Sequence, residues 1–250
     1  MESRLKNVID IDQYRPQQNT LLAALSSSEC GRLAGDLELV PLKLGQVLYE
    51  SDQTMSHAYF PLNCIVSLLY VMDNGASAEI AIVGNEGMIG VALFMGGEST
   101  PSRAIVQNAG HAYRLKAQVL KDEFHTGGAL SRLLLMFASA LMTQMVQTAA
   151  CNRHHTVDKQ LCRWLLLSLD RLVSNRITMT EKLIGNMLGI GSAEVVKAAS
   201  ALQKAGLIDY HGGEITVKNR AGVEKRSCEC YAVVKKESDR LIPHSVRANR

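Results

Sequence analysis

Hydrophobic and polar positions follow one pattern in the first half of the chain and another in the second. From Leu37 to about Phe124, short apolar runs such as LELVPLKL, CIVSLLYVM and AEIAIV are separated by turn residues. Runs of this length between Gly- and Asn-containing turns are typical of antiparallel sandwiches and barrels. Asn74-Gly75 lies between two of the runs and favours a type I′ hairpin turn. We therefore predict an antiparallel β structure for this region.

Two segments precede the predicted strands. Residues 1–19 are polar and aperiodic, which predicts a loose arm. The stretch TLLAALSSSECGRLAGDLELV follows, with apolar residues at helical spacing and serines suited to capping. It predicts one or two short helices.

The period becomes helical after Gly127. The stretch GGALSRLLLMFASALMTQMVQTAACNRHH contains no proline, and its apolar positions 130, 134, 137 and 141 alternate steps of four and three. This spacing predicts one helix over about 129–153, with one face packed on its own domain. The run LLLM at 133–136 adds surplus apolar surface. We therefore predict a dimerisation helix that uses Leu134, Phe137 and Leu141.

The last hundred residues contain three further helical patterns and a hairpin pattern. VDKQLCRWLLLSLDRL predicts an amphipathic helix, and TMTEKLIGNMLGIG predicts a second, with Thr178 and Glu181 spaced as a capping box. A third helix runs from Ser192 to about Ala205 and ends at Gly206, where a left-handed cap is expected. LIDYHGGEITVKN alternates around two glycines as a hairpin does. Three helices followed by a hairpin predict a winged helix.

The second and third of these helices have the residue pattern of a helix-turn-helix. The helix in TMTEKLIGNMLGIG would pack on the helix that begins at Ser192 through Leu183, Ile184, Met187 and Leu188, and Gly189 would allow the tight turn between them. The helix that begins at Ser192 would bury Val195, Ala198, Ala199 and Leu202. Its opposite face would present Ser192, Ala193, Glu194, Val196, Lys197 and Ser200 to a groove of DNA. The alternative is an ordinary helical hairpin in an α-rich domain.

Composition and charge agree with a globular protein that meets a polyanion through one end. The chain has 250 residues, 47% hydrophobic and 20% charged. Residues 1–150 carry a net charge of −4 and residues 151–250 a net charge of +7. The stretch LLLMFASALM is shorter than the roughly 20 residues of a membrane span, and the first 20 residues have no apolar signal-peptide core. We expect a cytoplasmic protein that does not enter a membrane.

The sequence offers little to a catalytic or metal site. Its six cysteines include no CxxC pair, and we find no nucleophile–base pair or metal-ligand spacing. We therefore predict no catalytic residues, no enzyme activity and no metal ligands. Cys228 and Cys230 would direct both thiols to one face of a strand, which leaves a redox or metal role open beside that of two ordinary strand cysteines.

These segments together resemble a Crp/Fnr-family bacterial transcription regulator over nearly the whole chain. The resemblance is carried by CRWLLLSLDRL, MTEKLIGNMLGIGSAEVVKAASALQKAGLI and YHGGEITVKNRAGVE. It implies an α+β fold, with a jelly-roll-like antiparallel β-roll, a long dimerisation helix and a C-terminal winged helix. It also implies a homodimer on palindromic double-stranded promoter DNA, with RNA polymerase as a further partner. The implied divisions are an arm at 1–19, a cyclic-nucleotide-binding-like sensor at 20–127, the dimerisation helix at 128–155, the DNA-binding domain at 156–235 and a tail at 236–250.

The chain departs from the cyclic-nucleotide-binding members of this family in the effector pocket. Gly90 is present, but Val91 and Ala92 stand where the glutamate that binds ribose is expected. Arg103 matches the arginine that binds phosphate, yet Ala104 follows it in place of a hydroxyl residue. Met145 replaces a polar residue of the long helix. The resemblance thus implies a pocket at Gly90, Val91, Arg103, Ala104 and Met145 for an unidentified effector other than cyclic AMP.

The cofactors of other family members are not evident in this chain. The first forty residues hold only Cys30, so we expect no iron–sulfur cluster of the N-terminal type. Haem stays open through His57, His111, His125 or His154. No cofactor is identified from the sequence.

The recognition helix also departs from the family pattern. Ser192 and Ala193 stand where an arginine and a glutamate are usual, and only Lys197 matches. Arginine bidentate to guanine is the commonest base contact, so direct reading of DNA is reduced. The alternative is a degenerate sensor or partner-binding protein whose winged helix has lost sequence-specific DNA binding. The predicted DNA-binding residues are Thr180, Ser192, Ala193, Glu194, Lys197, Ser200 and His211.

Overall fold

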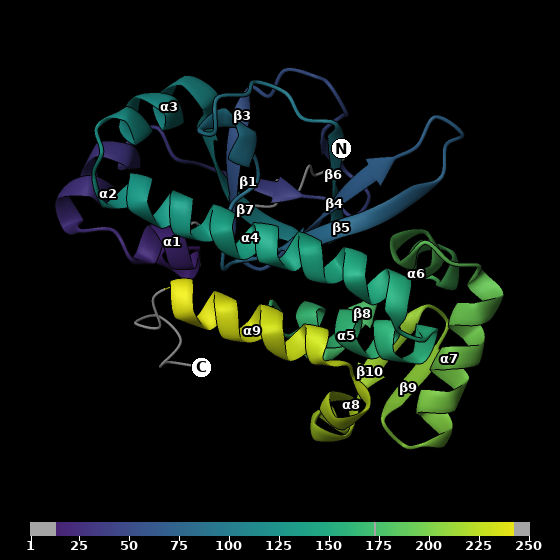
Figure 1. Ribbon diagram of the computed structural model, residues 1–250. Coiled ribbons are helices and arrows are strands. Elements are labelled where there is room, and N and C mark those ends of the chain that lie inside the picture. Colours follow the sequence, from purple (N-terminus) through teal and green to yellow (C-terminus); the bar gives the residue numbers. More distant parts are fainter. Residues whose placement is uncertain (1–13, 173, 243–250) are drawn as a thin grey trace, which may run out of the picture.

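The computed structural model describes residues 14–172 and 174–242. An N-terminal β-roll lies on one side of the long helix α4 (Ala129–His154), and the helical C-terminal region lies on the other (Figure 1). The predicted α+β class, with antiparallel sheets first and helices after, is confirmed.

Two antiparallel sheets form the roll. One has the strand order β1-β7-β3 and the other β2-β6-β4-β5. Their bounds are β1 Glu38–Leu42, β2 Val47–Tyr49, β3 His57–Pro61, β4 Ile65–Val71, β5 Ser77–Val83, β6 Ser102–Asn108 and β7 Gly110–Lys116. A short 3-10 helix, η3 (Val91–Leu93), lies between β5 and β6, and α3 (Ala117–His125) follows β7.

The hairpin predicted at Asn74-Gly75 joins β4 to β5, but its turn is not type I′. Gly75 has a φ of 81°, whereas Asn74 is not among the residues with positive φ. The Gly75 amide donates to the Met72 carbonyl, and the Met72 amide donates to the Ala76 carbonyl. Three residues therefore form the loop, and only the last needs the left-handed conformation.

The N-terminal segment is more ordered than predicted. The predicted arm covers residues 1–19, of which 1–13 lie outside the described residues. A 3-10 helix, η2 (Pro16–Gln18), precedes Asn19, whose buried side chain caps α1 (Thr20–Ala23). The Asn19 side-chain amide also donates to the carbonyls of Pro61 and Gly87. Another helix, α2 (Ser27–Ala34), begins with a capping box between Ser26 and Glu29.

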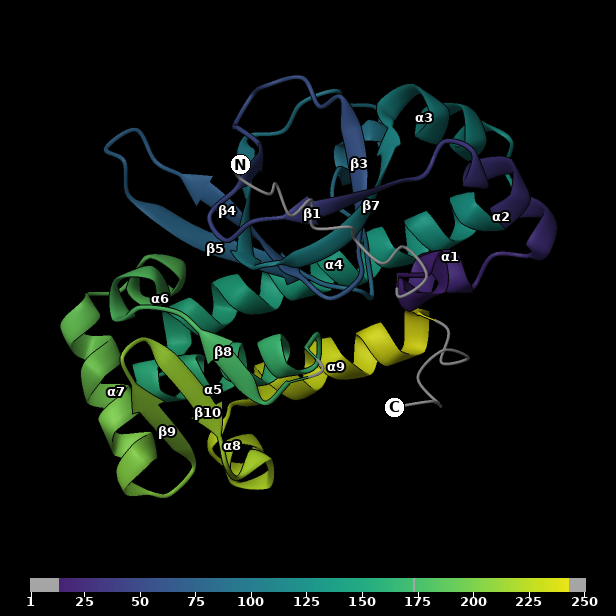
Figure 2. The same ribbon diagram turned by 180° about the vertical axis from the view of Figure 1, so that it is seen from behind.

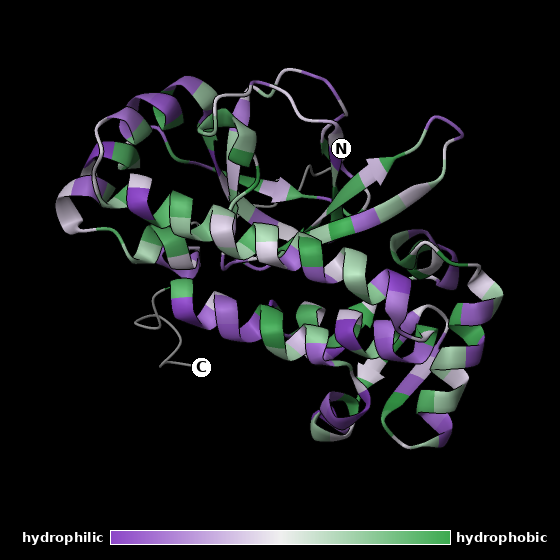
Figure 3. Ribbon diagram, viewed as in Figure 1, coloured by the Kyte–Doolittle hydropathy of each residue, from purple (hydrophilic) through white to green (hydrophobic). Residues whose placement is uncertain are grey.

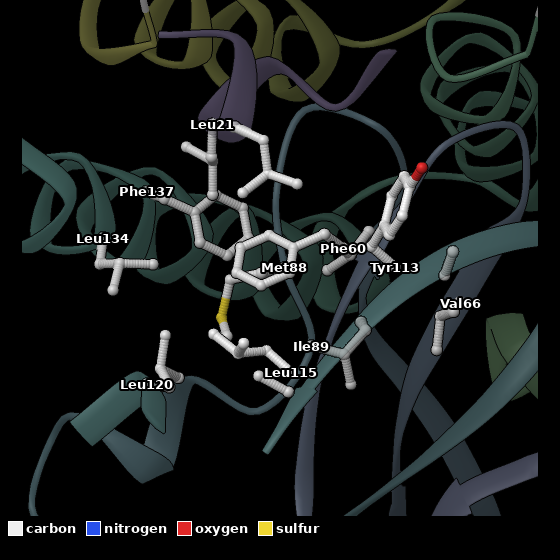
Figure 4. Close-up of a cluster of buried hydrophobic side chains, with 14 of the residues drawn as sticks. Leu21, Phe60, Val66, Met88, Ile89, Tyr113, Leu115, Leu120, Leu134 and Phe137 are labelled. Carbon is white, nitrogen blue, oxygen red and sulfur yellow. The ribbon is translucent and has the colours of Figure 1, made fainter. Parts of the chain in front are cut away.

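The apolar seam predicted for dimerisation lies in the core of the roll instead. Leu134, Phe137 and Leu141 are at most 5% exposed and belong to the roll's own hydrophobic core. Figure 4 shows Leu134 and Phe137 among side chains that come from the strands and from α1. A Cβ at Gly87 would lie 2.0 Å from the Phe137 ring, so this glycine permits the close packing. The three residues predicted at a dimer contact are therefore core residues.

A different face of α4 is exposed. Leu135, Met142 and Val146 are 54%, 53% and 64% exposed. They alternate steps of seven and four along the helix, which places them on one stripe. Figure 3 shows apolar residues along most of α4, with polar residues toward its C-terminal end.

The apolar part of α4 extends beyond the ten residues LLLMFASALM. It is long and apolar enough to cross a membrane by length and composition, with a window of mean hydropathy 1.5. Within the molecule, however, one side of α4 fills the core of the roll. A core helix of a globular domain meets the same two criteria.

The C-terminal region has the predicted three helices and hairpin, together with an additional strand, β8, and an additional short helix, α8. Its second core gathers around Trp164 of α5, a helix whose residues from Gln160 onward are all buried. β8 pairs with the hairpin as a third strand, which the sequence prediction missed because the strand has only three residues. The elements are α5 Val157–Leu169, β8 Arg176–Thr178, α6 Glu181–Leu188, α7 Ser192–Lys204, β9 Ile208–His211, β10 Glu214–Val217 and α8 Arg220–Arg226.

The last helix, α9 (Glu229–Leu241), returns along α4. Figures 1 and 2 show the two helices side by side and antiparallel. The predicted boundary at 235/236 falls inside α9, and residues 243–250 of the predicted tail lie outside the described residues. Cys228 and Cys230 were expected on a strand, but they lie at the N-terminal cap and in the first turn of α9. The alternation that predicted a strand is thus the start of an amphipathic helix.

Candidate nucleic-acid interface and effector region

The helix-turn-helix consists of α6, a short turn and α7. Thr180 caps α6, with its hydroxyl accepting from the Leu183 amide, so the predicted capping box at Thr178 and Glu181 is wrong. Thr178 instead ends β8. Gly189 ends α6 with a φ of 68°, as the turn requires.

The turn packs closely against the middle of α6. A Cβ at Gly185 would lie 2.8 Å from the Ile190 carbonyl oxygen, and the Ile190 amide donates to the Gly185 carbonyl. Ile184, Met187 and Leu188 are buried as predicted, whereas Leu183 is 39% exposed. The angle between the two helices is therefore fixed by backbone contact as well as by apolar packing.

α7 divides into the two predicted faces. Its buried stripe consists of Val195, Ala198, Ala199 and Leu202, all at most 6% exposed. The face away from the core is exposed and consists of Ser192, Ala193, Glu194, Val196, Lys197 and Ser200. The helix ends at Lys204 with Ala205 as its C-cap, and Gly206 has a φ of 70°.

Glu194 has a structural contact at the helix start. Its carboxylate accepts from the Gly191 amide at 3.2 Å. An acidic residue in the first turn is favourable there because it satisfies a free amide and faces the positive end of the helix dipole. This contact competes with the predicted role of Glu194 in accepting a hydrogen bond from cytosine.

The wing is the hairpin of β9 and β10, joined by Gly212 and Gly213. Both glycines have positive φ, and Glu214 pairs with His211 across the turn. His211 is exposed at the tip, beside the same turn. Of the predicted DNA-binding residues, Thr180 lies at the start of α6, His211 lies on the wing and the other five lie on α7.

The predicted effector residues lie in the β-roll and on the side of α4 that packs against it. Gly90, with a φ of 100°, precedes η3, and Val91 packs partly buried against the roll's core. Ala104 is fully buried in the same core, and Met145 of α4 packs against it. Arg103 instead forms an ion pair with Glu50, with Nε 3.2 Å from the carboxylate. The arginine expected to bind phosphate therefore has an anionic partner within the chain.

A hollow lies between the roll, the end of α5 and α9. Its volume is about 290 Å³, and Asn85, Asp170, Arg171, Arg220 and Lys235 contribute polar lining. A second cavity of about 180 Å³ lies among the N-terminal helices and is mostly apolar. Neither was predicted: the first combines segments that are distant in sequence, and the second depends on how the short helices within residues 16–37 pack against one another.

The four histidines considered for haem lie at separate places. His57 is on β3 with Nδ1 2.9 Å from the Ser56 hydroxyl, and His111 is on β7. Burial lowers the pKa of both imidazoles below the ordinary histidine value. His125 ends α3, and His154 is exposed at the end of α4.

Comparison with family models assigns both halves of the chain. Residues 39–126 match the cyclic nucleotide-binding domain, and residues 159–226 match the Crp-like helix-turn-helix domain. α9 lies beyond both matched ranges. The search of curated proteins gave no match.

Solved structures share the fold at low sequence identity. The chain resembles FixK2 from Bradyrhizobium japonicum with a TM-score of 0.64 and 17% identity, over 77% of this chain and 98% of that one. It resembles a Crp/Fnr-family regulator from Eubacterium rectale with a TM-score of 0.64 and 14% identity, over 82% and 96%. A CooA variant from Carboxydothermus hydrogenoformans gives a TM-score of 0.56 and 9% identity, over 90% and 97%.

Proposed function

The chain belongs to the Crp/Fnr family of transcription regulators, and on that premise we propose that it is a homodimer that binds palindromic promoter DNA through its winged helix. In this proposal the protein responds to an effector other than cyclic AMP. Members of this family regulate transcription and are not enzymes.

The free face of α7 is the observation that carries the DNA-binding proposal. All the residues of that face are exposed, while the opposite face is anchored in the second core. A helix held in this way can enter the major groove without unfolding any contact of its own domain. Ser192, at the helix N-terminus, is suited to a phosphate or base edge, and Lys197 to guanine or phosphate.

The exposed stripe of α4 supports the homodimer. Leu135, Met142 and Val146 are large apolar residues in water, and Ser139 and Ala149 extend the same stripe at heptad spacing. Two copies of this stripe would bury each other in a coiled-coil contact. The dimer contact that we propose therefore lies on the predicted helix, but on a different face from Leu134, Phe137 and Leu141.

The state of the effector residues supports exclusion of cyclic AMP. Val91 and Ala104 offer no carboxylate or hydroxyl, and Arg103 is paired with Glu50. Binding of a cyclic phosphate would have to break that pair and leave ribose hydroxyls without partners, at ~1–3 kcal/mol each. We propose a less polar effector. RNA polymerase as a partner and a cytoplasmic location follow from the proposed role in transcription.

Selection of DNA sites by the wild type and by Ser192→Arg tests the proposal. The added arginine restores a bidentate donor at the helix N-terminus, so the selected consensus should gain a guanine. It should gain one in each half-site, about one helical turn apart, because a dimer presents two α7 helices symmetrically. An unchanged consensus would remove α7 from the major groove and favour protein contacts as the role of the winged helix.

Lys197→Ala is the complementary test, because it removes a predicted contact with DNA instead of adding one. Gel shifts with the protein's own upstream region should show affinity for the best site falling by ~1–3 kcal/mol if Lys197 reads guanine. If it contacts only phosphate, affinity should fall about equally on all sequences, and the slope of log K against log salt should shrink by ~0.9. Lys236→Ala on α9, which removes the same charge far from α7, should change neither quantity.

A further inference from the structure

A cluster of three cysteines and one histidine joins two distant parts of the chain. Cys151 lies in the last turn of α4, and His155 is the C-cap residue that follows the helix. Cys228 caps α9 and Cys230 follows in its first turn. The three thiols are buried and the imidazole is half-buried. One ligand atom from each residue lies within 4.8 Å of the other three.

We propose that Cys151, His155, Cys228 and Cys230 bind one zinc ion in a structural site. Three thiolates and one imidazole are a common tetrahedral donor set for zinc. With a Zn–S distance of about 2.3 Å, tetrahedral geometry separates neighbouring ligand atoms by about 3.5–3.8 Å. The Sγ atoms of Cys151 and Cys228 are 3.5 Å apart, and Cys230 Sγ is 3.6 Å from His155 Nδ1. These two distances match the spacing around a single tetrahedral ion, and the other ligand atoms lie within 4.8 Å of one another, close enough to converge on it.

The surroundings of His155 support Nδ1 as the metal ligand. Its other nitrogen, Nε2, is 3.3 Å from a carboxylate oxygen of Glu229. A metal-bound histidine commonly donates its second N–H to a carboxylate, which fixes the tautomer and the ring orientation. Glu229 lies between the two cysteines of α9, so the same turn supplies ligands and orienting group.

The backbone that carries Cys151 and His155 is also held in place. Gln160 of α5 donates through its side-chain amide to the carbonyls of Cys151, Asn152 and His155, at 3.4, 3.4 and 2.8 Å. Prearranged donors bind a metal with less ordering of the chain. This turn between α4 and α5 is therefore built around the cluster.

Other uses of these cysteines fit the geometry less well. A disulfide between Cys151 and Cys228 would employ two of the four converging groups and leave Cys230 and His155 without a role. In a [4Fe–4S] cluster each cysteine binds a different iron, so the sulfurs would lie farther apart than they do here. A single zinc ion uses all four groups.

The site would tie the end of the C-terminal region back to its beginning. Cys151 and His155 lie where α4 leads into α5, the first helix of the winged-helix region, and Cys228 and Cys230 follow α8, its last. A zinc ion there fixes α9 along α4, and with it the orientation of α7 relative to the α4 stripe. The inference rests on the residues of the cluster and stands whether or not α7 binds DNA.

Metal analysis of the full-length protein, purified under anaerobic and reducing conditions, tests the site. We expect about one zinc per chain in the wild type and in Cys64→Ala. Cys64 is a matched control because it is also buried, but its thiol contacts the His111 carbonyl in the roll. Cys228→Ala and His155→Ala should retain little zinc. Equal zinc in all four proteins would overturn the assignment.

Cobalt and chelation provide readouts on the wild type alone. Stripped protein given Co²⁺ should develop the thiolate charge-transfer and visible bands of a tetrahedral S₃N site, and zinc should bleach them. Chelation should lower the melting temperature of the wild type and of Cys64→Ala, because binding to the folded state alone stabilises it. Failure to bind Co²⁺ would contradict the proposal, as would an intact mass two hydrogens lighter from a Cys151–Cys228 disulfide in metal-free protein.

Discussion

At the scale of single residues, Glu79 is a carboxylic acid within a buried polar chain. The Ser67 hydroxyl lies 2.7 Å from both Glu79 Oε2 and the side-chain oxygen of Gln107, and Gln107 in turn reaches Ser168 of α5. One hydroxyl proton cannot serve two acceptors. If Glu79 is protonated, it donates to Ser67, and Ser67 donates to Gln107. The hydrogen-bond pattern therefore favours the neutral acid.

Burial acts in the same direction. It raises the pKa of Glu79 to about 7, although Ser67, Arg163 and Arg171 pull that pKa downward. An acid whose pKa is higher in the folded than in the unfolded chain contributes stability at low pH. That contribution is lost as pH rises from the ordinary pKa of 4.5 to about 7, because over this range the unfolded state gives up its proton while the folded state keeps it, and the loss is complete above about 7.

Glu79→Gln should therefore stabilise the protein above pH 7 and change little near pH 5. The amide donates to Ser67 as the acid does but carries no charge to bury. The gain at pH 8 should be up to about 3 kcal/mol, measured by urea unfolding across this range. Glu50→Gln, at a half-exposed carboxylate, should give no such rise. A Glu79→Gln gain that is equal at pH 5 and pH 8 would contradict the assignment of a neutral acid.

Single residues also show where sequence reasoning succeeds. The faces of α7 could be predicted because a helical period places Val195 and Lys197 on opposite sides with no knowledge of the neighbours. The cysteine–histidine cluster could not, since 77 residues separate Cys151 from Cys228 and only tertiary packing brings their thiols together. Glu79 gave no signal because an acid in an alternating strand is ordinarily exposed.

At the scale of elements, α4 shows what periodicity leaves open. The predicted helix of 129–153 is confirmed within a residue, as Ala129–His154. The heptad spacing correctly predicted that α4 has an apolar face, but the helix has apolar residues on two faces. Assigning one face to the roll and one to a partner needs the position of the roll, which the sequence pattern does not contain.

Substitutions on the two faces of α4 should separate stability from association. Met142→Glu should dissociate the dimer because it places a charge at the proposed seam, with little loss of stability in the monomer, where residue 142 is already exposed. Leu134→Ala should lower the free energy of unfolding by ~2–5 kcal/mol through a cavity in the core. Sedimentation velocity and urea unfolding measure the two effects. Dissociation by neither Met142→Glu nor Val146→Glu would exclude the exposed stripe as the dimer contact.

At the scale of the whole molecule, the two halves pack against each other through polar contacts. Arg171, just after α5, donates from Nε to Glu86 at 2.7 Å, and both side chains are at most 10% exposed. Glu86 also accepts from the Gly84 amide, and Arg171 donates to the Leu167 carbonyl. The sequence indicated two parts, but ion pairing between residues 85 positions apart carries no local pattern.

Removing one partner of this ion pair should lower the free energy of unfolding more than replacing both partners does. Glu86→Ala leaves a buried guanidinium without its carboxylate, so the free energy of unfolding should fall by about 3–5 kcal/mol. Glu86→Leu combined with Arg171→Met removes both charges and keeps most of the volume, and should cost much less. Amide exchange should locate the single variant's loosening at residues 84–87 and 168–171, where roll and winged helix meet. Additive losses in the double variant would instead show that the two side chains act independently, and that apolar packing alone holds the halves together.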